Sequence, residues 1–177
     1  WYPHPDPLAN IAIHPLDELP DSVNLTSVSM DGSMVSDTSS GDSLFSCGRF
    51  DPQRINDRSL KPVVSFGKVS KYPELVKTGL MGPDSKPIDV EGFMTQWSIW
   101  GGAAGSPVFR YSLDSIDESK VLFIGLIHSH LSASDSQAMG EILDNGFLQT
   151  AEFETAVVVP AWRITEALQE GPLADAR

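Results

Sequence analysis

The chain has 177 residues, a size that fits one domain, and 41% of them are hydrophobic, enough for a packed core rather than a disordered chain. Its formal net charge of −12 argues against nucleic acid as a partner, because a phosphate backbone demands lysine and arginine, and it favours basic partners instead. No apolar run approaches the ~20 residues that cross a bilayer, so no membrane partner is expected.

Short strand patterns separated by turn residues recur along the chain. The expected strands are, in chain order, residues 10–13, 43–47, 62–70, 92–99, 107–112, 121–128 and 155–159. One helix is expected over residues 162–169 after Pro160, and residues 138–143 could form one or two helical turns. This strand-rich order predicts an all-β protein, built as a closed antiparallel barrel or a sandwich.

Three segments have the composition of loops. Residues 22–42 are rich in Ser, Thr, Asp and Gly, residues 72–87 carry three prolines and two glycines, and residues 132–149 are polar. We expect connections in all three, and a frayed tail over residues 171–177.

The most informative segment runs from residue 101 to residue 109 and reads GGAAGSPVF. A glycine-rich turn leads directly into a strand, and glycine lets the backbone take positive φ, so that successive N–H groups can point one way. Two such donors could hold the oxyanion of a tetrahedral intermediate, and here they would be the amides of Gly102 and Ala104. A phosphate-binding loop is not indicated, because no Gly-Lys-Ser/Thr ending or helix pattern follows.

This segment resembles the Gly-x-Ser-Gly-Ser-Pro-Val motif of trypsin-like serine peptidases with the chymotrypsin fold, in their bacterial-type form. Ala104 stands where the family has its nucleophilic serine, and Ser106 is not a substitute because it occupies the position just before the proline. The resemblance extends over about residues 6 to 169. Its other matching segments are residues 41–50 and 62–70, the substrate-pairing strand at 121–130, and the last strand with the helix entry at 156–162.

The resemblance implies a double six-stranded antiparallel β-barrel with a C-terminal helix, the first barrel being incomplete at its N-terminus. Residues 1–40 would hold the remainder of the first barrel and the linker, residues 41–170 the second barrel and helix, and residues 171–177 a tail. No signal peptide begins the chain and Trp1 is not a start residue, so we expect a larger parent with sequence upstream.

The acid of the catalytic triad corresponds to Asn10, because residues 10–13 match the family pattern Asp-Ile-Ala-Leu. An amide cannot stabilise an imidazolium as a carboxylate does. Asp6 could substitute if the register shifts, or it could be a turn residue between two prolines. His4 and His14 lie too close to Asn10 to match the base, which we therefore expect upstream of Trp1.

The substrate-binding residues implied by the resemblance are Ser98, at the base of the primary pocket, and His128, Ser129 and His130 on its wall. Two histidines could recognise an acidic side chain or narrow the pocket, unless one of them points into the core or to solvent. His128 and His130 could also share a strand face, but no third ligand is evident, so no metal site is expected. Trp97 and Trp100 could pack near the pocket entrance or belong to an aromatic core.

The resemblance implies a serine endopeptidase that hydrolyses peptide bonds through an acyl-enzyme in its parent form and is inactive as written, because Ala104 replaces the nucleophile. Either Ala104 was introduced into an active parent, or the domain is a natural pseudoprotease that binds a peptide or protein; Asn10 supports the second reading. No cofactor is implied. The partners would be a protein or peptide substrate, and could include other domains or chains of a larger assembly. Cys47 is the only cysteine, which fits a cytoplasmic, bacterial-type setting better than a disulfide-stapled secreted one.

Overall fold

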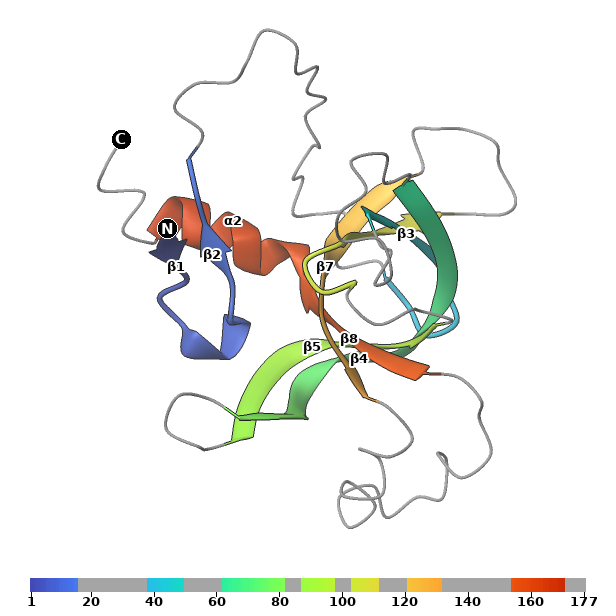
Figure 1. Cartoon of the computed structure of the whole chain (residues 1–177), viewed down its shortest axis with the longest axis horizontal. Coiled ribbons are helices and arrows are strands. Elements are labelled where there is room, and N and C mark those ends of the chain that lie inside the picture. The colour runs from blue at the N-terminus through green and yellow to red at the C-terminus, as the bar shows by residue number, and fades with distance from the viewer. Residues whose placement is uncertain are drawn as a thin grey trace, which may run out of the picture.

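The computed structural model describes seven stretches of the chain: residues 1–15, 38–49, 62–81, 87–97, 103–111, 121–131 and 154–170. These residues are mostly β strand (Figure 1). Their elements are β1 (Tyr2–Pro3), the 3₁₀ helix η1 (Pro7–Ala9), β2 (Ala12–Ile13), β3 (Ser43–Arg49), β4 (Pro62–Met81), β5 (Pro87–Trp97), β6 (Pro107–Tyr111), β7 (Leu122–Leu131), β8 (Glu154–Pro160) and α2 (Ala161–Glu170). The helix turns predicted at residues 138–143, the loop at 132–149 and the tail at 171–177 lie outside the described residues.

Six strands close into one antiparallel barrel in the order β3-β4-β5-β8-β7-β6, and α2 follows the last strand directly. The all-β prediction and the expected helix are therefore confirmed at this level. The N-terminal residues add a separate two-stranded sheet, in which β1 pairs with β2. The described elements establish one barrel, not the double barrel that the resemblance implies.

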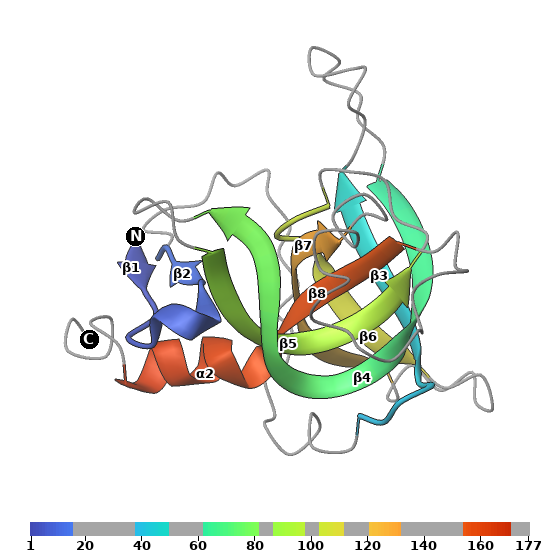
Figure 2. The ribbon, with the colours of Figure 1, turned by 90° about the horizontal axis from the view of Figure 1, so that it is seen from below.

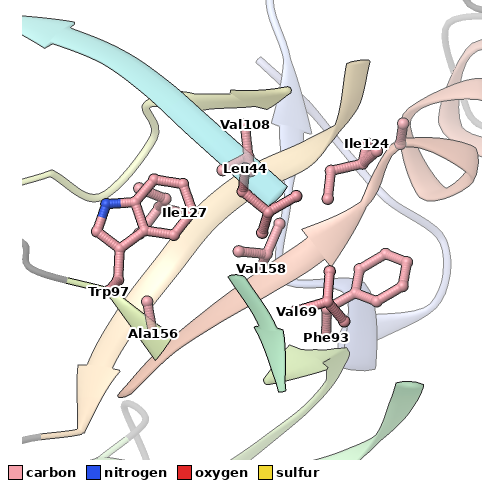
Figure 3. Close-up of a cluster of buried hydrophobic side chains, with 10 residues drawn as sticks. Leu44, Val69, Phe93, Trp97, Val108, Ile124, Ile127, Ala156 and Val158 are labelled. Atoms are coloured by element: carbon pink, nitrogen blue, oxygen red, sulfur yellow. The ribbon is translucent and has the colours of Figure 1, made fainter. Parts of the chain in front are cut away.

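The barrel interior is filled by alternate residues of its strands, which gather in one cluster (Figure 3). Trp97 is its largest member, only 1% exposed, and its indole Nε1 donates to Ser65 Oγ at 2.9 Å. Gly67 lies opposite Trp97 in the register, and a Cβ there would stand 2.4 Å from the indole ring. Trp97 is therefore a core residue that needs a glycine as its neighbour.

The β4–β5 hairpin corrects the sequence prediction, which made residues 72–87 a loop because of their prolines and glycines. β4 continues to Met81, β5 begins at Pro87, and these two residues are register partners. Register shifts between Val69 and Lys71 and between Lys71 and Glu74 accommodate Pro73 next to the ladder. Burial of apolar side chains along this extension outweighs the local turn signals.

The apolar side chains of the β4–β5 extension are buried in a second cluster. It contains Val76 of β4, Val90 of β5, and Val157 and Val159 of β8, with Ile11 packed against them. Val158 points the other way, into the barrel. Strand β8 is apolar at consecutive positions because both of its faces are covered.

The N-terminal segment docks on the outer wall of the barrel beside α2 (Figure 2). Arg163 of α2 is the main polar link, since its guanidinium contacts Glu91 of β5, Glu166 at 2.8 Å and Asp6 at 3.3 Å. The buried His4 places Nε2 3.4 Å from Glu166. Among the described residues no helix is both long and apolar enough to cross a membrane.

Candidate functional site

The predicted glycine-rich turn is formed at residues 103–106. The amide of Ser106 donates to the carbonyl of Ala103 at 3.0 Å, and Gly105 adopts a φ of +82°. That positive φ is the reason for glycine at this position. Ala104 is exposed at the apex of the turn. Gly102, Trp100 and Ser98 lie outside the described residues. The oxyanion role of the Gly102 and Ala104 amides and the pocket base at Ser98 therefore stay predictions.

Two backbone hydrogen bonds join this turn to β7. The amide of Gly105 donates to the carbonyl of Ile127 at 2.7 Å, and the amide of Ile127 donates to the carbonyl of Ser106 at 3.0 Å. The residue expected to carry the nucleophile therefore lies beside the strand expected to pair with substrate.

Strand β7 has two halves with different partners. Its residues from Leu122 to Leu126 pair with β6 on one side, while its pairing with β8 continues to Leu131. Within the described parts of the chain, residues 129–131 therefore have register partners only on β8. Strand addition of an extended segment is a common use of a strand edge beside a turn.

A β-bulge separates the two halves. Ile127 pairs with Val158 and Ser129 pairs with the neighbouring Val157, so His128 is the extra residue. A bulge redirects the side chain of its extra residue and increases the local twist. Here Ser129 is buried, with 6% of its surface exposed, whereas His128 is half-buried and faces the N-terminal segment.

Asn10 meets His128 across 118 positions of sequence, with Nδ2 of the amide 2.6 Å from Nε2 of the imidazole. An amide nitrogen only donates, so Nε2 is the acceptor in this contact. Burial lowers the pKa of His128, which also favours the neutral ring. The role of His128 toward a substrate side chain stays a prediction.

The local structure around Asn10 differs from the predicted strand over residues 10–13, because β2 begins only at Ala12. Asn10 instead ends η1 with its backbone in the left-handed region, at φ 46° and ψ 44°. Its backbone N–H donates to the carbonyl of Pro7 at 3.2 Å. Asp6 caps the start of the same 3₁₀ helix by accepting from the amide of Leu8 at 2.9 Å. This agrees with the turn interpretation of Asp6, whose carboxylate also pairs with Arg163.

The remaining histidines are dispersed. His14 is exposed and makes an edge contact with Trp1, with 5.1 Å between ring centroids, whereas His4 is buried beside α2. His130 is partly buried and lies opposite Ala156 of β8. No group of three or more His, Cys, Asp or Glu side chains suited to a metal ion occurs among the residues that the structure describes.

Sequence reasoning selected Asn10, Ala104 and His128 separately, and the structure brings Asn10 and His128 into contact. It missed this contact and the role of Arg163 in holding the N-terminal segment. No local pattern could have revealed either, because both join residues far apart in the chain. No family model matches the chain, and no curated protein or solved structure matches it significantly.

Proposed function

We propose that the chain contains the second barrel of a trypsin-like serine peptidase domain with the double-barrel chymotrypsin fold, and that as written it binds an extended peptide or protein segment without hydrolysing it. The closed six-stranded barrel followed by a C-terminal helix is consistent with this fold. On this proposal, a first barrel would pack on the side where η1 contacts β5 and β2 contacts α2.

One observation carries the proposal: the turn at residues 103–106 is hydrogen-bonded to β7 beside the half of that strand paired only with β8 among the described residues. An extended peptide could add to this edge through its main chain, and the turn would bound the site at one end. Main-chain pairing of this kind gives affinity, while adjacent side chains select the sequence.

Two residues explain why this site would not hydrolyse what it binds. The methyl group of Ala104 provides no nucleophile. Asn10 carries no charge to stabilise an imidazolium, and an Asp-to-Asn change in a chymotrypsin-like triad lowers the rate about 10⁴-fold. The two departures, Ala104 and Asn10, affect different members of the triad. This favours a natural pseudoprotease over an active enzyme in which only the serine was replaced.

A binding experiment tests the proposal directly. The protein is used to select from a displayed library of random decapeptides, and the enriched peptides are measured by titration. Ala104→Trp should abolish that binding, because a large side chain at this exposed apex would obstruct the proposed binding edge of β7. Ala12→Trp is the matched control, since Ala12 is also exposed but lies on β2. Absence of any enrichment would refute the proposed function.

The second candidate is an active endopeptidase whose serine at position 104 has been replaced. The turn with positive φ at Gly105 is consistent with this candidate, because it is the turn on which the resemblance places the nucleophile. Ala104→Ser in this protein should then react covalently with a fluorophosphonate probe. Lack of labelling in a folded variant would leave the binding function as the better account.

A further inference from the structure

We propose that Asn10 is a positioning residue for peptide binding: its amide fixes the bulged His128 and thereby the part of β7 formed by residues 129–131. This inference rests on the proposed function for its consequence, but its structural content can be tested without a ligand. On this inference Asn10, at the position of the catalytic acid, holds a strand in place and takes no part in proton transfer.

The Asn10 side of this contact is firmly held. Its backbone is in the left-handed region, where asparagine is among the few non-glycine residues found often. On one side the 3₁₀ helix is capped by Asp6, which is itself paired with Arg163 of α2. On the other side the carbonyl of Ile11 accepts from the amide of His4 at 2.9 Å, and the Ile11 side chain packs on the second buried cluster.

On the other side of the contact, His128 lies where the β7–β8 ladder is interrupted. Ile127 is anchored on both sides, by β8 and by the turn at residues 103–106. Beyond the bulge, residues 129–131 have register partners only on β8 within the described chain. A side-chain bond at the extra residue supplies a second attachment at the point where the ladder is interrupted.

The chemistry of the pair explains why an amide suits position 10. Asn10 Nδ2 donates to the lone pair of His128 Nε2, so both groups are neutral and complementary. A carboxylate at the same place has no proton to donate, and it would require a proton on Nε2. The tautomer of His128 therefore reports directly on the contact.

Nitrogen-15 NMR of the His128 imidazole in the free protein is the first test. Wild type should show the Nδ1–H tautomer with Nε2 unprotonated. Asn10→Asp should shift the proton to Nε2 and raise the pKa of His128, whereas the control Leu8→Ala, a change of an exposed side chain on the same 3₁₀ helix, should change neither. An unchanged His128 tautomer and pKa in Asn10→Asp would overturn the inference.

Amide hydrogen exchange is the second test, and it reads out the strand. Loss of one hydrogen bond in Asn10→Ala should speed exchange of the amides of residues 129–131 about fivefold, with little change at β3. Since Gln can accept from the Asn10 amide, His128→Gln should retain most of the protection that His128→Ala loses. Uniform loss of protection over the barrel, or none, would overturn the positioning role.

The two proposals fail separately. If the library yields no peptide for wild type, the proposed function fails, yet the tautomer and exchange experiments still decide whether Asn10 fixes the strand. If wild type binds an enriched decapeptide, Asn10→Ala should weaken that binding about fivefold and Leu8→Ala should not. Equal binding by wild type and Asn10→Ala would overturn the inference while the binding function stands.

Discussion

The conformation of Gly105 can be tested by replacing it with alanine. Gly105 has a φ of +82°, and a Cβ added there would meet nothing within 4 Å. The change therefore causes no steric clash, and its effect is that of the backbone alone. An L-residue in the left-handed region costs roughly 1–2 kcal/mol, and the reduced freedom of the unfolded chain offsets about 0.4–1 kcal/mol of it. We expect a net loss of about 1 kcal/mol for Gly105→Ala.

Gly41 provides a matched control at another turn. It has a φ of +94°, a Cβ added there would again meet nothing within 4 Å, and its amide donates to the carbonyl of Val69 at 2.8 Å. Both variants should lower Tm by about 2–4 °C in a thermal unfolding experiment, as expected for a domain of this size. Only Gly105→Ala should also weaken binding of the selected decapeptide, because only that turn borders the proposed groove.

A different outcome would refute this reasoning at a definite step. If Gly105→Ala is as stable as wild type or more stable, the turn does not require positive φ at residue 105. If both variants lose stability but Gly105→Ala binds peptide normally, the turn is structural and does not bound the groove. Gly125→Ala should lower Tm much more than either variant and serves as the reference for a steric clash. A Cβ at residue 125 would stand 2.0 Å from the carbonyl oxygen of Val159.

Three further predictions concern titration, packing and docking. Burial lowers the pKa of His128 below 6.5, so the unfolded chain binds more protons at this residue than the folded chain does. The free energy of unfolding, measured with urea, should therefore fall as pH drops below about 6.5, and it should fall less in His128→Gln. Gly67→Ala should lose about 1–3 kcal/mol and alter Trp97 fluorescence, because the new Cβ would lie 2.4 Å from the indole ring. Arg163→Ala should expose residues 1–15 to limited proteolysis sooner than the barrel, since it removes the ion pair with Asp6; cleavage at the wild-type rate would contradict that role.

The barrel was predictable where local signals agree with the tertiary structure. Turn residues delimit β3, β6 and β8, and the β8 sequence is apolar because both of its faces are buried. The β4–β5 extension was not predictable, because Pro73, Pro83 and Pro87 outweigh its apolar residues in any local assessment. What decides its structure is the packing of Val76 and Val90 against β8, which sequence alone does not display.

The candidate site divides in the same way. The turn at residues 103–106 follows from Gly105, since the positive φ there is a local requirement. The bulge at His128 is not local, because it depends on the register between β7 and β8. The partner of His128 is set by how the N-terminal segment docks, which depends on Arg163 and the second buried cluster. A strand pattern over residues 121–128 contains no information about either.

The contact between Asn10 and His128 bears on whether serine alone at position 104 would restore hydrolysis. An acid in a catalytic triad must orient and stabilise the imidazole of the base. The side chain at position 10 is neutral here, and it already donates to His128 of β7. Replacing it with aspartate would supply the missing charge, but His128 would compete with the base for that carboxylate by taking up a proton of its own. Catalysis and the present fixation of β7 thus make opposite demands on one side chain, and we expect Ala104→Ser to stay slow unless both position 10 and position 128 are changed with it.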